Sequence, residues 1–278
     1  MFQRLYDGSF ILPEKNNELA IVKERYWNAR RNAAIILTLV TTTKCNLQCY
    51  YCYESSIKQT SKLNISDIPS ILELLSHLRE QSSASIVRVF WYGGEPLMNL
   101  KFLEKASEAI QQFCNHENID YKCVIISNGT VWPDDIESFV RRHKVQHVQL
   151  TFDGLEKHHN TNKKYRLAKN PHLQSSFEKT VSLVNKLYQY TQVIIRYNLD
   201  NANKDDLLPF LDFMRAQGWF NGHYPVSFQI ARVNNYTKNC SVPHAYPKST
   251  CDVFGAALTH APSTSCPPLS SLSFPWFP

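Results

Sequence analysis

The stretch IILTLVTTTKCNLQCYYC, residues 35–52, joins an apolar, β-branched run to a loop that holds three cysteines. These are Cys45, Cys49 and Cys52, so three of the chain's eight cysteines fall within eight positions. Thiols this close in sequence can converge on one inorganic centre. A structural zinc site would usually need a fourth Cys or His nearby, and none follows in the next twenty residues. The pattern therefore indicates an iron–sulfur cluster with one iron left open.

Five further apolar runs follow this first strand candidate, and stretches with helical spacing separate them. The six runs are 35–41, 86–92, 121–127, 147–152, 192–198 and 226–231, and the helical stretches begin near Ile68, Phe102, Asp134, Phe177 and Leu207. Near-continuous apolar strands that alternate with amphipathic helices predict a parallel sheet covered by helices. The predicted fold class is therefore α/β, a partial (β/α)6 TIM-like barrel whose ligands lie beyond the carboxyl ends of the strands.

The chain divides into three predicted regions. Residues 1–34 hold a short strand candidate near Phe10 and a helix whose Leu19, Val22 and Tyr26 face inward, which predicts an N-terminal extension packed on the barrel. Residues 35–232 form the barrel. Residues 233–278 hold seven of the fourteen prolines and many serines, so we expect an irregular tail there.

Composition favours a globular protein, because 43% of the 278 residues are hydrophobic. The longest apolar run is far shorter than the ~20 residues that cross a bilayer, and the N-terminus lacks the basic and apolar segments of a secretory signal. We therefore expect a cytoplasmic protein without a membrane partner. The net charge of +6 is spread along the chain, so nucleic acid is not an expected partner either.

Polar motifs follow the next four strand candidates. Gly93, Gly94 and Glu95 come directly after the second, where two glycines allow a ligand to approach the backbone and the carboxylate can accept hydrogen bonds from an ammonium group. The following three end in Ser127-Asn128-Gly129-Thr130, Thr151-Phe152-Asp153-Gly154 and Arg196-Tyr197-Asn198. Each motif supplies hydroxyl, amide or charged groups where a barrel ligand would lie.

Taken in strand order, these five motifs resemble the radical S-adenosylmethionine (SAM) superfamily, in its peptide- and protein-maturase branch of SPASM-type, sulfatase-maturase-like enzymes. The hallmark of that superfamily is Cys-x3-Cys-x2-Cys with an aromatic residue, here Tyr51, before the last cysteine. The resemblance implies that Cys45, Cys49 and Cys52 ligate a 4Fe–4S cluster whose fourth iron binds SAM. It further implies reductive cleavage of SAM to a 5′-deoxyadenosyl radical that modifies a peptide or protein substrate, with an electron donor such as a flavodoxin or ferredoxin.

The same resemblance assigns residues to SAM. In that branch the GGEP motif binds the amino group, a hydroxyl residue at the position of Thr151 contacts the cofactor, and a basic residue about twelve positions later binds the carboxylate. Here that basic residue is Lys163, and Arg166 is a nearby substitute. The implied SAM-binding residues are Tyr51, Gly93, Gly94, Glu95, Ser127, Asn128, Thr151, Asp153, Lys163, Arg196 and Asn198. No catalytic acid or base is assigned.

The resemblance extends from the N-terminal extension to about Arg232. Members of the branch continue into a cysteine-rich C-terminal domain with auxiliary clusters, whereas only Cys240, Cys251 and Cys266 remain here, so we expect a truncated or altered C-terminal region. Three alternatives stay open: a radical SAM enzyme that acts on a small molecule, a protein that binds SAM and the cluster without substrate turnover, and a zinc-stabilised interaction module.

The remaining cysteines and histidines of the barrel have simpler interpretations. We expect Cys114 and Cys123 to be small buried hydrophobic residues. His158 and His159 follow the fourth strand candidate, where a substrate contact is conceivable, but packing or surface roles are favoured.

Overall fold

A parallel sheet of six strands forms the centre of the computed structural model, which describes residues 17–31, 34–56, 60–167, 174–221 and 223–233. The strands are β1 (Ile35–Thr42), β3 (Ile86–Gly93), β4 (Asp120–Ser127), β5 (Val145–Phe152), β7 (Gln192–Leu199) and β8 (Ser227–Arg232). They lie in the order β1-β3-β4-β5-β7-β8, and every neighbouring pair is parallel. All six predicted strands and the α/β, partial-barrel fold are confirmed.

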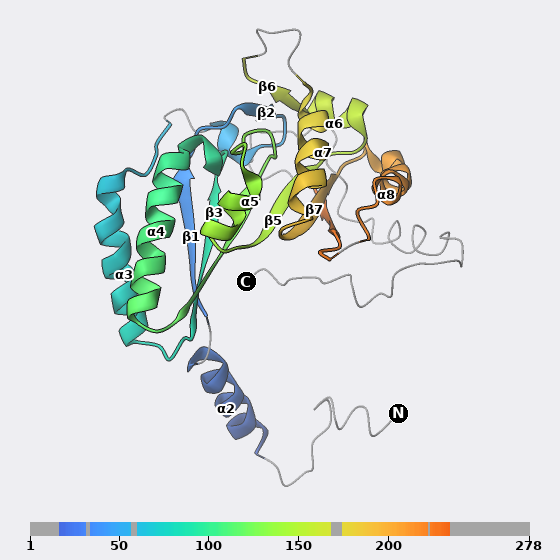
Figure 1. Ribbon diagram of the computed structural model, residues 1–278. Helices are drawn as coiled ribbons and strands as arrows, with labels where there is room; N and C mark the ends of the chain where they lie inside the picture. Colours follow the sequence, from blue (N-terminus) through green and yellow to red (C-terminus); the bar gives the residue numbers. More distant parts are fainter. Residues whose placement is uncertain (1–16, 32–33, 57–59, 168–173, 222, 234–278) are drawn as a thin grey trace.

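Helices connect successive strands and cover one face of the sheet (Figure 1). The main crossover helices are α3 (Ile68–Glu80), α4 (Leu100–His116), α5 (Ile136–Arg142), α7 (Ser176–Leu187) and α8 (Leu207–Ala216), and four 3₁₀ turns accompany them, η1 (Tyr53–Ser56), η2 (Ile65–Asp67), η3 (Pro96–Asn99) and η4 (Lys204–Asp206). Alternate strand residues such as Val193 and Ile195 are fully buried against helix residues such as Phe210. Burial of these two apolar surfaces against each other holds the helices to the sheet.

Two short elements beyond the predicted ones lie next to the cysteine loop. Strand β2 (Leu47–Cys49) pairs antiparallel with β6 (Lys163–Tyr165), so that Cys49 lies opposite Lys163. Helix α6 (Glu156–Asn162) connects β5 to β6. Strands of three residues carry too little periodicity to be predicted from sequence. Their pairing brings the segment after β5 against the cysteine loop.

The predicted helix of the N-terminal region is present as α2 (Glu18–Arg31), but its predicted inward face is wrong. Leu19 and Val22 are each 62% exposed and Tyr26 is 50% exposed. Figure 1 places α2 beyond the amino ends of the strands, where it has no sheet face to cover. None of the helices in the described ranges is long and apolar enough to cross a bilayer.

The strand candidate near Phe10 and residues 234–278 of the predicted tail lie outside the described residues. The division into an extension, a barrel and a tail therefore stays a prediction.

Candidate functional site

The predicted site motifs meet at one edge of the sheet. Each follows the carboxyl end of a strand, and parallel strands place these ends side by side. The cysteine loop, residues 45–52, follows β1 and makes hydrogen bonds to residues at the ends of β4, β5 and β7. Lys44, directly before the loop, accepts a hydrogen bond from the Glu95 nitrogen after β3. The structure thus brings the predicted motifs together around this loop.

The three cysteines of the loop are partly exposed free thiols. The Cys45 sulfur lies 3.4 Å from the Leu47 backbone nitrogen and 3.6 Å from Asn128 Nδ2, and both nitrogens donate to it. Burial raises the pKa of the Cys49 thiol to about 12, while the Lys163 ammonium group opposes this shift. Nitrogen donors to a cysteine sulfur are among the features that tune the reduction potential of a cluster bound there.

A single-ion site has no support in the described part of the chain. No group of three or more His, Cys, Asp and Glu side chains there is arranged to hold one metal ion. This finding leaves the zinc alternative without a ligand set among those residues. An iron–sulfur cluster binds each cysteine at a different iron, so Cys45, Cys49 and Cys52 need not converge on one atom. The separation of the three thiols is therefore compatible with a cluster.

Gly93 and Gly94 let the end of β3 lie directly against the backbone that leads into the cysteine loop. The Gly94 nitrogen donates to the Thr42 carbonyl at 2.9 Å, and a Cβ atom at Gly94 would lie 2.6 Å from the Lys44 carbonyl oxygen. A Cβ at Gly93 would meet the Thr42 oxygen at 2.3 Å. Protein backbone thus occupies the space that a Cβ atom at either position would need. Contact of these glycines with SAM stays a prediction.

Glu95 connects the end of β3 to the end of β4. Its side chain is fully buried; Oε1 accepts from the Ser127 hydroxyl at 2.9 Å and from the Leu97 nitrogen at 3.3 Å, and Oε2 accepts from the Asn128 nitrogen at 2.8 Å. Burial raises the pKa of Glu95 to about 7, although these hydrogen bonds oppose the shift. Three donors of the protein already bind the carboxylate, so Glu95 fixes Ser127 and Asn128 relative to the cysteine loop.

Two adjacent tyrosines attach the cysteine loop to β5 and β7. The Tyr51 hydroxyl donates to Asp153 Oδ1 at 2.9 Å and accepts from Asn198 Nδ2 at 3.0 Å. The Tyr50 hydroxyl donates to Asp200 Oδ2, and the other oxygen of Asp200 accepts from two backbone nitrogens. Tyr51, Asp153 and Asn198 therefore form one hydrogen-bonded group, and their predicted contact with SAM stays a prediction. Tyr50 and Asp200 were not predicted.

Lys163 is a buried cation at the centre of the site. Its ammonium group donates to the Thr151 carbonyl at 2.9 Å and to the Thr151 hydroxyl, and it lies 4.0 Å from Asp153 Oδ1. Burial raises the pKa of Asp153, and Lys163 opposes the shift. Asp153 Oδ2 is buried without a hydrogen-bond partner among the described residues. This oxygen is free to accept a hydrogen bond from a bound ligand.

The two arginines of the predicted site have different surroundings. Arg166 is exposed, and its Nε donates to the Leu47 carbonyl at 3.0 Å, so this side chain supports the cysteine loop. Arg196 is half-buried on β7, in register with Thr151 on β5. Within the described ranges Arg196 makes no hydrogen bond or ion pair, which leaves its guanidinium group available for a ligand.

Some site contacts carry no sequence signal. Asn46 donates to the Thr130 hydroxyl at 2.8 Å and accepts from Asn128 Nδ2 at 2.9 Å, which joins the cysteine loop to the end of β4. Asp200 lies two residues after Asn198, so only its proximity to that motif could have indicated it. These pairings join residues more than eighty positions apart in the chain, and pattern reading within one segment does not detect them.

The packing roles expected of the other residues are observed. Cys114 and Cys123 are fully buried. His159 is also fully buried, with its ring against Phe152 and Phe177. His158 is half-buried, and its Nδ1 lies 2.6 Å from Asp206 Oδ2.

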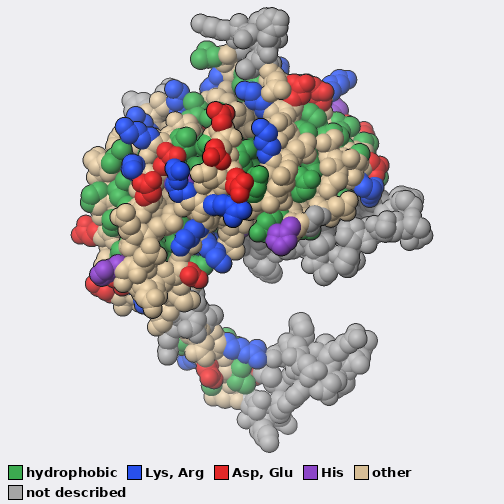
Figure 2. Space-filling model, in the orientation of Figure 1, with side chains coloured by type: hydrophobic (Ala, Val, Ile, Leu, Met, Phe, Trp, Pro, Cys, Tyr) green, Lys and Arg blue, Asp and Glu red, His purple; other side chains and the backbone are tan. Residues whose placement is uncertain are grey.

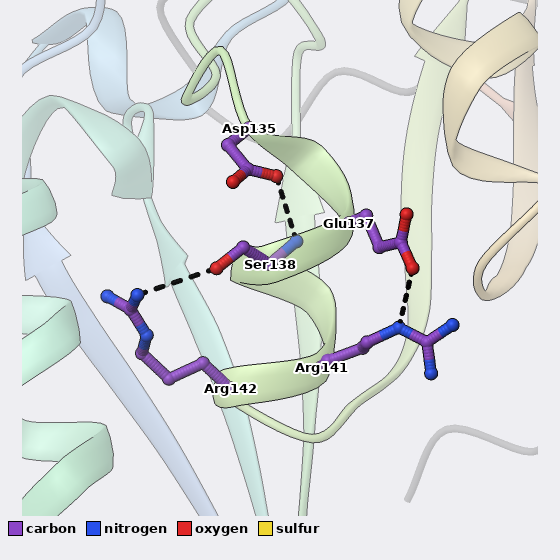
Figure 3. A pocket seen from close by; sticks show the side chains of 5 residues that line it. All are labelled: Asp135, Glu137, Ser138, Arg141 and Arg142. Atoms are coloured by element: carbon purple, nitrogen blue, oxygen red, sulfur yellow. Dashed lines mark hydrogen bonds and ion pairs between the residues drawn. The ribbon is translucent and has the colours of Figure 1, made fainter.

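A separate pocket on α5 carries no feature of a ligand site (Figure 3). Asp135 caps the helix by accepting from the Ser138 nitrogen at 3.0 Å, and Arg141 pairs with Glu137 at 2.9 Å. Arg142 donates to the Ser138 hydroxyl at 3.4 Å. The polar groups that line the pocket bind one another along one short helix, which is ordinary for a charged helix surface.

Comparisons with known proteins agree with this arrangement. Residues 39–214 match the family model of the radical SAM superfamily. The chain is 21% identical, over a 302-residue alignment, to the radical SAM cyclopropyl synthase TigE of Paramaledivibacter caminithermalis, with coverage of 92% of this chain and 63% of that protein. It is 29% identical over 133 residues to a cysteine-type anaerobic sulfatase-maturating enzyme of Clostridium perfringens, with coverage of 46% and 35%. The chain thus spans less than two thirds of the length of either relative.

The fold is also similar to that of a solved structure, native anSMEcpe with bound AdoMet and Kp18Cys peptide. The TM-score is 0.61 at 19% identity, and the alignment covers 75% of this chain and 56% of that chain. At this identity the similarity establishes the fold alone. The family model covers more than half of this chain and includes all five strand-end motifs. The chain therefore belongs to the radical SAM superfamily.

Proposed function

We propose that this chain is a radical SAM enzyme that holds a 4Fe–4S cluster through Cys45, Cys49 and Cys52 and modifies a peptide or protein substrate. One observation carries the proposal: the cysteine loop, together with Lys44 directly before it, is hydrogen-bonded to the motifs at four other strand ends. Glu95 donates its backbone N–H to the Lys44 carbonyl at 2.9 Å, and Asn128 donates to the Cys45 sulfur. Asp153 and Asn198 bind the Tyr51 hydroxyl.

When bound, the cluster supplies an electron that cleaves SAM to a 5′-deoxyadenosyl radical able to abstract hydrogen from the substrate. The chain's own residues hold the site rigid for this chemistry. The Leu47 and Asn128 nitrogens orient the Cys45 sulfur, and Glu95 fixes Asn128 through its backbone nitrogen. A site built in this way on strand ends is preorganised.

The proposed SAM site lies around Thr151. Lys163 contacts Thr151 directly, and Arg196 lies opposite Thr151 in the β5–β7 register. This arrangement supports a role for both cations in binding the carboxylate of SAM. Asp153 Oδ2 is the unpaired buried acceptor for a donor group of the ligand. The implied contacts of Tyr51, Gly93, Gly94, Glu95, Ser127, Asn128 and Asn198 belong to the same proposal, in which Glu95 acts by positioning its neighbours.

The proposal of a peptide or protein substrate is based on the similar proteins. The sulfatase-maturating enzyme and the peptide-bound structure are similar to 46% and 75% of this chain, and these similarities support a peptide substrate. A flavodoxin or ferredoxin is the proposed electron donor. The five described cysteines are all free thiols, which supports a reducing compartment such as the cytoplasm.

Anaerobic reconstitution with iron and sulfide, followed by addition of SAM and dithionite, tests the proposal. We expect 5′-deoxyadenosine from the wild type, none from Cys49→Ser, and wild-type amounts from the control Cys123→Ser. A library of candidate precursor peptides, analysed by mass spectrometry, should contain a peptide whose mass changes with turnover. Deoxyadenosine without any modified peptide would favour a small-molecule enzyme or a protein without turnover, and absence of deoxyadenosine from iron-loaded wild type would contradict the proposal.

A further inference from the structure

Four exposed cations surround the cysteine loop. They are Lys44, Lys62, Lys164 and Arg166, which we call the cation frame. Lys44 directly precedes Cys45, and Lys62 lies beside Thr42 at the end of β1 through an antiparallel bridge. On the other side, Lys164 lies opposite Gln48 in the β2–β6 pair, and Arg166 donates to the carbonyls of Asn46 and Leu47. The frame therefore follows both sides of the loop.

Negative charge does not balance this frame within the described segments that form it, residues 42–56, 60–63 and 163–167. The one acidic residue there is Glu54, which is half-buried. Glu95, Asp153 and Asp200 lie near the loop but are fully buried. None of the four cations forms an ion pair with a described residue. The exposed margin of the loop is therefore positive.

The helix-covered face of the molecule differs from this margin. Figure 2 shows Asp and Glu side chains interspersed with Lys and Arg over that face. Several of these form ion pairs at helical spacing, as Lys105 does with Glu108 at 2.8 Å. A surface on which positive and negative charges alternate has a weak net electrostatic field. A group of cations around one loop, in contrast, attracts an acidic partner and orients it during encounter.

We propose that the cation frame is the docking surface of a small acidic electron-transfer protein, such as a flavodoxin, that reduces the cluster. The inference rests on the proposed function. In the transfer, one electron leaves the reduced flavin of the donor, which is oxidised, and enters the cluster held by the cysteine loop, which is reduced. No bond forms or breaks on this chain in that step. The frame carries the charge complementary to an acidic protein and surrounds the loop that receives the electron.

The steric and electrostatic features of the frame favour a protein over a nucleic acid. Its cations lie on two sides of a compact loop, and the two tyrosines within that loop, Tyr50 and Tyr51, use their hydroxyls inside the protein. Single-stranded nucleic acids are bound by aromatic side chains that stack on bases. Tyr53 is the exposed aromatic residue of these segments, and its hydroxyl contacts the Tyr92 hydroxyl at 2.9 Å. The four cations of the frame suit attraction to a carboxylate-rich protein surface.

The test compares two pairs of charge reversals of equal size. Lys62→Glu/Lys164→Glu reverses the frame without altering a cluster ligand or Arg166, whose side chain supports the loop. Lys23→Glu/Lys186→Glu is the control, because these lysines are also exposed but lie on α2 and at the end of α7. Flavodoxin affinity is measured by biolayer interferometry from low to high salt, and SAM cleavage is driven by reduced flavodoxin or by dithionite.

We expect the frame variant to bind flavodoxin at least about tenfold more weakly at low salt, with a shallower salt dependence than the wild type. Its flavodoxin-driven rate should fall to a similar extent, while its iron content and dithionite-driven rate stay at wild-type values. The control pair should match the wild type in every measurement. If the reversal lowers iron content, Lys62→Gln/Lys164→Gln makes the same comparison with a smaller charge change.

Unchanged flavodoxin affinity in the frame variant would overturn the proposal, as would an equal loss in the control pair. Loss of binding to a single-stranded oligonucleotide, with flavodoxin binding intact, would also overturn it by assigning the frame to another partner. Failure of the proposed function gives a different result, because wild type would then lack dithionite-driven SAM cleavage. The binding measurement decides the docking surface in either case.

Discussion

Single residues at the strand ends decide how closely the cysteine loop is held. Gly94 permits backbone contact with Lys44, and Glu95 binds the start of the segment after β4. Both were predictable as site residues from the GGEP motif and its place after a strand. Their physical roles were not, because the motif does not reveal that the glycines face the Thr42–Lys44 backbone.

Replacement of Gly94 by alanine tests this close contact. The added Cβ would lie 2.6 Å from a backbone oxygen that has little freedom to move, so we expect a loss of about 1–3 kcal/mol in the free energy of unfolding. The displaced loop should also retain less iron after reconstitution. Gly218→Ala is the control: its Cβ meets no atom within 4 Å, and its positive φ should cost about 1 kcal/mol without loss of iron. Urea unfolding and iron assays check both. Full stability and iron in Gly94→Ala would contradict the account.

Glu95 should make stability depend on pH. Its pKa is about 7 in the folded chain against 4.5 when unperturbed, so between these values the folded chain holds a proton that the unfolded chain has lost. The free energy of unfolding should therefore fall as pH rises from about 4.5 to about 7, by about 3 kcal/mol, and then level off. Glu95→Gln removes this titration. Urea unfolding across that pH range should give a free energy of unfolding that falls more steeply for the wild type than for the variant. Parallel pH profiles of the two proteins would show that Glu95 does not bind a proton on folding.

At the scale of elements, hydrogen bonds between segments fix the cysteine loop over β5 and β7. Long apolar strands were predictable because each carries its own pattern, and all six lie where their runs placed them. The β2–β6 pair was not, since three-residue strands form only through their partners. The inward face predicted for α2 was wrong because periodicity reports an apolar stripe but not whether a surface exists to receive it.

The tyrosine attachment is tested by Tyr51→Phe. This variant removes a hydroxyl that donates to Asp153 and accepts from Asn198, so we expect a loss of about 1–2 kcal/mol and faster release of iron to a chelator. The control is Tyr53→Phe in the same segment, since the Tyr53 side chain is 49% exposed and its hydroxyl contacts the Tyr92 hydroxyl at the surface. Equal iron release from the two variants would show that the buried hydroxyl does not hold the loop.

Variants of the buried pair Lys163 and Asp153 distinguish an effect on stability from an effect on SAM binding. Lys163→Met leaves the Asp153 carboxylate buried without a cation, which should cost about 3–5 kcal/mol. Addition of Asp153→Asn should restore much of that stability. Both variants should bind SAM more weakly, as measured by equilibrium dialysis, because the cation proposed for its carboxylate is absent. Wild-type SAM affinity in the stable double variant would remove Lys163 from the SAM site.

At the scale of the molecule, the chain combines a complete six-stranded sheet with a site at the carboxyl edge of that sheet. The edge was predictable, because five motifs follow five successive parallel strands. The contacts that join the motifs were not predictable. Tyr50 and Asp200, for example, are 150 residues apart, and nothing in the sequence pairs one with the other.

Iron content after anaerobic reconstitution tests the central claim, that the cysteine loop holds a 4Fe–4S cluster. We predict roughly four irons per wild-type chain and none in Cys45→Ala/Cys49→Ala/Cys52→Ala. The control Cys114→Ala/Cys123→Ala changes two fully buried cysteines outside the loop and should bind iron as the wild type does. A wild type that binds zinc and no iron, or a triple variant that retains its iron, would contradict the account.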